Sequence, residues 1–179
     1  MKRKIALIIL SLVLVLGLMP ATVAAAKAPP APKFVDFNAG GVISYITPGD
    51  VFPAGASGRY IVQERELGGA LAGSINGAYS LTYKANVELA TQAGNLHGTL
   101  QTGSYSLDVN GKIEPLEFVG WYAPGIPLYY LEINGQWTFV NGEQGNGDFT
   151  AGAVFIPTLD GHVGYIVQSG FVMTGKWAP

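Results

Sequence analysis

A strict alternation of apolar and polar residues between Ala78 and Leu89 constrains the fold of this chain more than any other feature. One set of alternate positions carries Tyr79, Leu81, Tyr83, Ala85, Val87 and Leu89. The intervening set carries Ser80, Thr82, Lys84, Asn86 and Glu88. Successive side chains of a strand point to opposite faces, so this pattern predicts a strand with one buried and one solvated face. One-sided burial is typical of antiparallel sheets.

Asn-Gly and Asp-Gly pairs recur along the chain and indicate how the strands connect. Both pairs tolerate the positive φ angles of tight hairpin turns. They lie at 76–77, 110–111, 134–135, 141–142, 146–147 and 160–161. Asn134-Gly135 has the strongest flanking pattern, since Tyr129, Leu131 and Ile133 alternate before it and Trp137 and Phe139 follow it. We therefore predict a hairpin at Asn134-Gly135 and an antiparallel meander overall.

The remaining pattern predicts an all-β domain, because no long stretch after residue 33 has apolar residues at helical spacing. The expected strands cover 40–47, 59–66, 68–74, 77–89, 95–107, 113–122, 128–134, 136–141, 148–157 and 162–177. A meander of about eight to ten strands can protect its edges by closing into a barrel, which we favour, or by forming a two-sheet sandwich. Glycines within the strands would permit the coiling that closure requires: Gly68, Gly69, Gly73, Gly98, Gly120, Gly152 and Gly164.

The N-terminal segment predicts export. Basic residues at 2–4 precede an apolar run at 5–19, and small residues follow at 21–26. This is the organisation of a cleavable signal peptide, with cleavage expected near Ala26. The apolar run, about 15 residues, is shorter than the roughly 20 needed to span a bilayer as a helix. We expect a secreted, periplasmic or cell-envelope protein, with a Pro-rich linker at 27–33 and one domain at 34–179.

Charge and cysteine content exclude several classes of function. The chain has 10 Lys and Arg and 12 Asp and Glu, and removing the three basic residues at 2–4 leaves 7 against 12, a net charge of −5. Nucleic-acid binding needs concentrated positive charge, so we expect no nucleic-acid partner. The chain has no cysteine, which excludes disulfides, thiolate metal sites and a lipidated N-terminal Cys. We expect no membrane span after cleavage, and the oligomeric state stays open.

Catalytic and metal-binding patterns are weak. His97 and His162 are the only histidines that could orient a nucleophile. His97 lies between Leu96 and Gly98 on the side of its strand that we expect to face solvent, and His162 follows the turn at 160–161. Ligand residues are not clustered at the spacings of metal sites. We therefore expect no catalytic residue of this type, no metal and no cofactor.

Glu64 is the one weak catalytic candidate. Regular alternation places Tyr60, Val62 and Glu64 on the same face of a strand. If Tyr60 and Val62 point inward, Glu64 enters the barrel, where burial would raise its pKa and suit it to acid/base chemistry. The alternative is a solvated strand end whose charges discourage edge pairing.

Aromatic residues around a Pro-rich loop are the strongest binding candidates. Trp121, Tyr122, Tyr129 and Tyr130 frame the segment Ala-Pro-Gly-Ile-Pro-Leu, and Trp137 follows. Rings with polar tips suit a barrel mouth that binds an apolar ligand, or a platform for sugar rings. Tyr122 and Tyr130 flank the loop and are the preferred contacts, while Trp121, Tyr129 and Trp137 are expected to pack inside.

Four functions are consistent with these patterns, and no family signature selects among them. The leading hypothesis is a non-catalytic exported barrel that binds a small apolar, aromatic or carbohydrate ligand. An isomerase or cyclase type of enzyme would use Glu64 as its acid/base. A structural or cell-surface interaction domain would need no pocket. An outer-membrane barrel would require the face from Tyr79 to Leu89 to point toward lipid.

Overall fold

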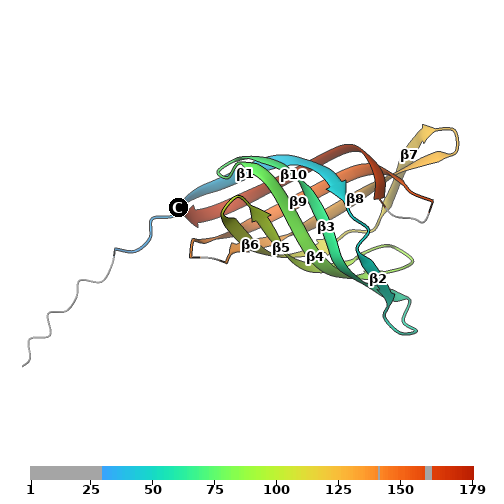
Figure 1. Ribbon diagram of the computed structural model, residues 1–179, viewed down its shortest axis with the longest axis horizontal. Helices are drawn as coiled ribbons and strands as arrows, with labels where there is room; N and C mark the ends of the chain where they lie inside the picture. Colours follow the sequence, from blue (N-terminus) through green and yellow to red (C-terminus); the bar gives the residue numbers. More distant parts are fainter. Residues whose placement is uncertain (1–29, 141, 160–162) are drawn as a thin grey trace, which may run out of the picture. The chain divides into compact units, whose positions relative to one another are not determined.

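Ten β-strands and no helix make up the part of the chain that the computed structural model describes, residues 30–140, 142–159 and 163–179 (Figure 1). The strands are β1 (Val35–Ile46), β2 (Asp50–Pro53), β3 (Arg59–Gly73), β4 (Gly77–Glu88), β5 (Gly94–Thr102), β6 (Tyr105–Ile113), β7 (Glu117–Ala123), β8 (Ile126–Phe139), β9 (Gln144–Pro157) and β10 (Val163–Ala178). The prediction of an all-β domain is confirmed.

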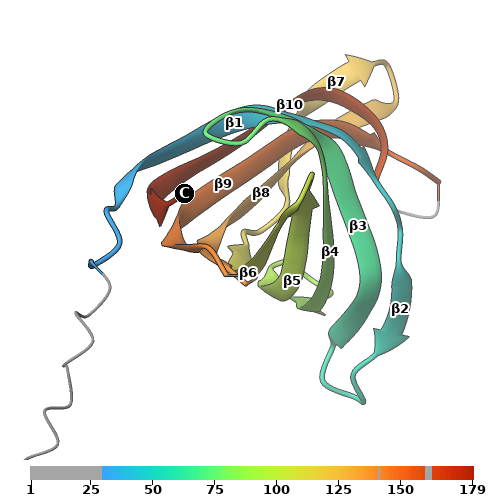
Figure 2. The same ribbon diagram turned by 60° about the vertical axis from the view of Figure 1, so that its left-hand side comes forward.

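The strands form an antiparallel meander that closes on itself. Each strand of the order β1-β10-β9-β8-β6-β5-β4-β3 pairs with its neighbours, and β1 also pairs with β3 (Figure 2). These eight strands are a closed barrel, which confirms the favoured prediction and not the two-sheet sandwich. The two others are additions to the wall, since β2 pairs with β3 and β7 pairs with β8. Both extend from the end of the barrel opposite the C-terminus (Figures 1 and 2).

Closure depends on glycine where β1 meets β3. A Cβ atom on Gly41 would lie 1.9 Å from the Ala70 carbonyl oxygen, and one on Gly69 would lie 1.9 Å from that of Val42. Only glycine permits backbones to approach this closely. A register shift between Ile43 and Tyr45 adds the local bend that a barrel needs.

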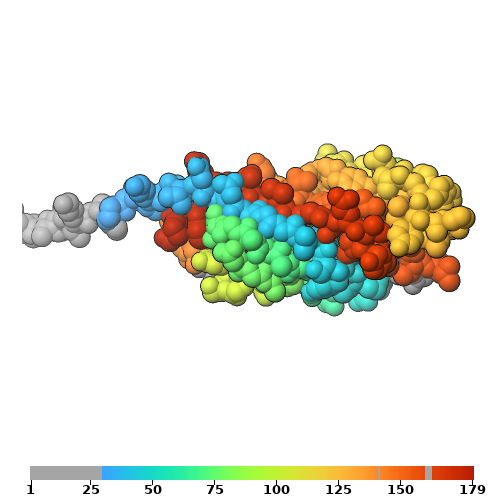
Figure 3. All heavy atoms as spheres, turned by 90° about the horizontal axis from the view of Figure 1, so that it is seen from above, coloured from blue at the N-terminus to red at the C-terminus, as the bar shows by residue number. Residues whose placement is uncertain are grey.

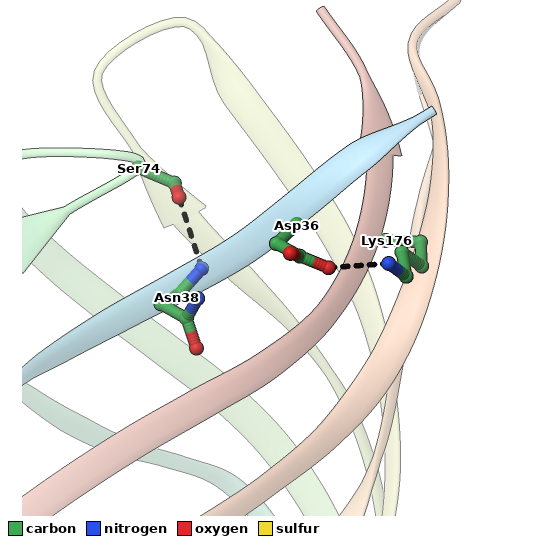
Figure 4. A network of polar contacts seen from close by, with 4 residues as sticks. All are labelled: Asp36, Asn38, Ser74 and Lys176. Atoms are coloured by element: carbon green, nitrogen blue, oxygen red, sulfur yellow. Dashed lines mark hydrogen bonds and ion pairs between the residues drawn. The ribbon is translucent and has the colours of Figure 1, made fainter. Parts of the chain in front are cut away.

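Polar contacts flank β1 on both sides near its start. The backbone N–H of Asn38 donates to Ser74 Oγ in the β3–β4 turn at 2.9 Å, and Lys176 of β10 pairs with Asp36 (Figure 4). The space-filling view shows β1 in blue beside β10 in red along one face (Figure 3). The first strand is thereby held between the last strand and the β3–β4 hairpin.

The barrel interior is the hydrophobic core. Tyr79, Leu81, Tyr83, Ala85 and Val87 are all buried, while the intervening side chains of β4 point outward. The predicted one-sided burial of this strand is confirmed from Tyr79 to Val87, whereas Leu89, expected on the same face, lies beyond the end of β4 and is exposed. The outer-membrane barrel considered above would have required these apolar side chains of β4 to point outward. No helix that could span a membrane is present among the described residues.

Aromatic rings fill the end of the barrel that contains the chain's C-terminus. Phe37 lies 4.5 Å from Trp137 between ring centroids, and Phe139 stacks on Trp177 at 5.7 Å. Tyr105 packs edge-on against Trp177. Aromatic pairs in these geometries stabilise beyond the area they bury. This end of the barrel is therefore solid.

The predicted hairpin at Asn134-Gly135 is wrong, because β8 runs without interruption from Ile126 to Phe139. Gly135 pairs with Gly111 of β6, and a Cβ atom on Gly135 would lie 2.6 Å from the ring of Phe149. Because Gly111 and Gly135 have no side chains, they leave room inside the barrel for the Phe149 ring. Asn110-Gly111 and Asn146-Gly147 also lie within strands rather than at turns.

Of the other predicted turns and strand boundaries, some are confirmed, some are wrong and some are untested. Asn76-Gly77 does stand at the turn between β3 and β4. The expected break at residue 67 is absent, since β3 continues through it, and the expected strand 95–107 is divided by a turn at Gly103, whose φ is 57°. Asn141 and Asp160-Gly161 lie outside the described residues.

Residues 33–179 form one compact unit. Residues 30–32, which belong to the N-terminal unit, adopt no regular structure. The predicted signal peptide and residues 27–29 of the predicted linker lie outside the described residues.

Candidate functional site

A cavity of about 300 Å³ lies inside the barrel, at the end opposite the packed rings of Phe37, Trp137, Phe139 and Trp177. Most of its wall is apolar, and Tyr60, Tyr83, Arg65 and Gln92 add polar groups. The apolar wall consists of Val51, Val62, Val87, Leu89, Ile113, Leu116, Leu131, Phe155 and Val163. Leu89 and Val51 are exposed, so the rim of the cavity is accessible to solvent.

A β-bulge in β3 determines which charged residue enters this cavity. Val62 pairs with Ala85 and Arg65 pairs with Tyr83, so three steps along β3 match two steps along β4. The extra residue is accommodated at Glu64, whose φ of 52° is in the left-handed region. After the bulge the alternation is reversed, and Arg65 rather than Glu64 shares the interior face with Tyr83.

The hypothesis that Glu64 enters the barrel is therefore wrong, and its exposed side chain agrees with the alternative that this segment is solvated. Tyr60 and Val62 do line the cavity, as that expectation required, but Glu64 is exposed and does not. Regular alternation cannot be extended through a bulge, because the inserted residue shifts every later side chain to the opposite face. The acid/base hypothesis required a buried carboxyl group at Glu64, and this group is exposed.

The corner between β1 and β2 holds the bulge in place. The backbone N–H of Thr47 donates to the Glu66 carbonyl oxygen at 2.8 Å, and the N–H of Glu66 donates to Thr47 Oγ1 at 2.8 Å. A Cβ atom on Gly49 would lie 2.5 Å from the Gln63 carbonyl oxygen. The corner and the bulge are thus in direct backbone contact, with no room for a side chain at Gly49.

Arg65 is oriented by two partners. Its Nε donates to the Pro48 carbonyl oxygen at 2.9 Å, and its guanidinium interacts with the Tyr83 hydroxyl. Burial raises the pKa of Tyr83 above its ordinary value, and the nearby Arg65 charge partly opposes this shift. Among the described residues, no carboxylate forms an ion pair with Arg65.

The segment after β4 forms part of the rim. Gln92 has a φ of 59°, unusual for a residue with a side chain, and its Nε2 donates to the Leu89 carbonyl oxygen at 2.9 Å. The N–H of Leu116 donates to the Thr91 carbonyl oxygen at 2.9 Å. This second contact joins the rim segment to the connection between β6 and β7.

None of the five aromatic binding candidates lines the cavity. Trp121 and Tyr122 lie on the β7–β8 hairpin and are 62% and 59% exposed, so the expectation that Trp121 packs inside is wrong. Tyr129 is partly buried against Phe118 and Phe155. Trp137 does pack inside, in the solid end, where its Nε1 donates to the carbonyl oxygens of Asp148 and Thr174 at 3.2 Å each.

Tyr130 borders a shallow groove on the outer wall. Thr150, Gly152, Gln168 and Val172 are among its neighbours there. Desolvation raises the pKa of Tyr130, with smaller contributions from Glu132 and Glu117. The groove is separate from the cavity, because it lies on the outward faces of β8, β9 and β10.

The structure describes one of the two histidines, His97. His97 points outward, as expected, and its Nδ1 lies 2.8 Å from Asn110 Oδ1 on β6. His162 lies outside the described residues. In the part of the chain that the structure describes, no three His, Cys, Asp or Glu side chains are grouped to hold a metal ion.

Comparison with protein-family models, curated proteins and solved structures gave no match to this chain. The cavity is therefore the main indication of function in the described structure. The residues that line it were partly visible in the sequence, because the alternation in β4 places Tyr83 and Val87 inside. The position of Arg65 in the cavity could not be predicted, since no local sequence pattern indicates the bulge that turns its side chain inward.

Proposed function

We propose that this protein is an exported, non-catalytic barrel that binds a small, largely apolar ligand in the cavity between β2, the start of β3 and the base of the β7–β8 hairpin. The cavity itself carries this proposal. Ligand pockets are typically concave, mostly apolar and about 300–1,000 Å³, with a few polar groups that orient the ligand. The cavity of about 300 Å³ has this composition and falls at the small end of the range.

The contrast between the two barrel ends supports the same function. Core residues pack at near-crystalline density, so an unfilled apolar space forgoes stabilising contacts. Aromatic rings fill the end that contains Trp137 and Trp177, and a folding scaffold alone would gain from filling the other end as well. A space kept open at the solvent-accessible end is expected when a ligand supplies the missing contacts.

A blocking substitution tests this proposal directly. Leu116 lies at the cavity wall, whereas Leu159 is fully exposed outside it. We expect the neutral fluorescent probe N-phenylnaphthylamine to bind the unmodified protein, to bind Leu116→Trp much more weakly, and to bind the control Leu159→Trp unchanged. Denaturant midpoints would verify that both variants are folded. Absence of probe binding, or equal binding to both variants, would contradict the cavity as the binding site.

The exposed aromatic hairpin favours a second candidate function, surface interaction. Phe118, Trp121 and Tyr122 are all more than a third exposed, and Phe118 packs edge-on against Trp121 at 5.3 Å. Adjacent exposed rings can stack on sugars. We expect Trp121→Ala to abolish retention on an immobilised polysaccharide such as cellulose or chitin if this function holds, with Trp121→Phe retaining part of it.

Export is a separate part of the proposal. Expression of the full chain in a bacterial host, followed by N-terminal sequencing of the product outside the cytoplasm, is expected to give a mature protein that begins near Lys27. An intact N-terminus in the cytoplasmic fraction would contradict it.

A further inference from the structure

We propose, as a refinement that rests on the proposed binding function, that the ligand is an apolar carboxylate whose anionic group binds the Arg65 guanidinium inside the cavity. The first observation is the position of the charge. Arg65 stands opposite the buried Tyr83 in the β3–β4 register, and both residues line the cavity. A charged side chain thus lines a cavity whose wall is mostly apolar.

The second observation is that this charge lacks a counter-ion within the protein. Arg65 has the Pro48 carbonyl oxygen and the Tyr83 hydroxyl as partners, and no described carboxylate pairs with it. Arg65 is only half-buried, and an anion that displaces the remaining solvent from its guanidinium would supply the pairing that a charge in a largely apolar space needs. Its neighbours Glu64 and Glu66 do not meet this need: Glu64 is the exposed residue of the bulge, and Glu66 accepts a hydrogen bond from Tyr45 on the outer wall.

The third observation is that the guanidinium is held before any ligand arrives. Nε donates to the Pro48 carbonyl oxygen and one further donor of the guanidinium meets the Tyr83 hydroxyl, so Nη hydrogens remain for a ligand. Arginine matches the planar geometry of a carboxylate and binds it through paired hydrogen bonds. The Thr47 to Gly49 corner and the bulge fix the backbone on both sides, so little side-chain entropy remains to be lost on binding.

The apolar wall defines the rest of the ligand. Leu131, Phe155 and Val163 come from β8, β9 and β10, across the barrel from β3. A ligand that reaches Arg65 while filling this space needs a compact hydrocarbon or aromatic body. A small anion without such a body, for example acetate, would leave the apolar wall unfilled and is expected to bind far more weakly.

A matched pair of probes tests the charge separately from the cavity. Decanoate and decanamide share their hydrocarbon chain and differ in the charge of the head group. We expect calorimetry at neutral pH to show that decanoate binds at least about tenfold more tightly than decanamide, the usual scale for a hydrogen bond to a charged group. Acetate at the same concentration is expected not to displace decanoate.

Two substitutions, each of which removes one positive charge, test whether the preference for decanoate depends on Arg65. Arg65→Gln is expected to bring the affinity for decanoate down to that for decanamide, and Lys84→Gln is the control because Lys84 is exposed on the outer face of the adjacent strand. Arg65→Lys keeps the charge without the planar geometry and is expected to fall between. Denaturant midpoints verify folding of each variant.

The outcomes separate the two proposals. Equal affinity of the unmodified protein for decanoate and decanamide would overturn the carboxylate assignment and leave the binding cavity standing. A preference for decanoate that Lys84→Gln reduces as much as Arg65→Gln would also overturn it, since the effect would then be one of net charge. No binding of either probe or of N-phenylnaphthylamine would contradict the binding function itself. The probe comparison on the unmodified protein remains decisive even if Arg65→Gln does not fold.

Discussion

Arg65 and Pro48 are joined by a hydrogen bond of 2.9 Å, in which the Arg65 Nε donates to the Pro48 carbonyl oxygen. This contact links the bulge of β3 to the corner between β1 and β2. It places the cationic end of a side chain at the cavity of a barrel whose other interior side chains are mostly apolar. The stability of the corner therefore bears directly on the candidate site.

Substitution of Gly49 tests how tightly the corner fits the bulge. Gly49 and Gly55 both have left-handed backbones, with φ of 63° and 67°, but a Cβ atom would meet the Gln63 carbonyl oxygen only at Gly49. Gly55→Ala should cost about 1–2 kcal/mol of unfolding free energy from backbone strain alone. Gly49→Ala should cost about 1–3 kcal/mol more, because the methyl group must displace backbone. Urea denaturation of both variants measures the difference, and equal losses would refute the close contact.

A second glycine pair tests the continuous path of β8. A Cβ atom on Gly135 would lie 2.2 Å from the Asn110 carbonyl oxygen, whereas one on Gly170 meets nothing within 4 Å. We expect Gly135→Ala to destabilise the barrel by about 1–3 kcal/mol through overpacking. Gly170→Ala, also in a strand, should be neutral or slightly stabilising because it restricts the unfolded chain. Thermal unfolding of the two variants provides the comparison, and a harmless Gly135→Ala would argue against the packing of β6 on β8.

Thr102 offers a stabilising substitution. Its side chain is 3% exposed, and its Oγ1 is a buried oxygen without a hydrogen-bond partner. A buried polar group left unsatisfied costs about 1–3 kcal/mol. Thr102→Val retains the shape and replaces the hydroxyl with a methyl group, so the free energy of unfolding should rise by about 1 kcal/mol or more. Thr102→Ser keeps the hydroxyl and should not stabilise. A loss of stability in the valine variant would show that the hydroxyl has a partner.

Alkaline pH should weaken the barrel through its buried tyrosines. Burial raises the pKa of Tyr79 above its ordinary value of 10.0, and its hydroxyl donates to the Val42 carbonyl oxygen at 3.3 Å. Because the folded state retains this proton more tightly than the unfolded state, stability is full below pH 10.0 and falls as pH rises above it. Tyr79→Phe should reduce that fall.

Urea midpoints at a pH of about 8 and about 11 measure the effect. Tyr122→Phe is the control, since its ring lies on the exposed hairpin. An identical loss of stability at high pH in Tyr79→Phe and in the unmodified protein would contradict the role of Tyr79.

Local patterns predicted the fold class well because they record burial one strand at a time. The alternation from Tyr79 to Val87 identified a strand and its inner face correctly. The same reasoning failed at Asn134-Gly135, where glycine is needed for a neighbouring ring rather than for a turn. A dipeptide cannot distinguish these two needs, because the Phe149 ring that decides between them comes from another strand.

The candidate site shows the same limit more sharply. The sequence by itself determined an antiparallel, cysteine-free β domain with one apolar face per strand, since period-two alternation follows from strand geometry alone. Only the tertiary structure decided that Arg65 rather than Glu64 enters the cavity. The bulge that turns it inward is stabilised by the Thr47 to Gly49 corner, which lies elsewhere in the chain and acts only after the barrel has brought the two segments together.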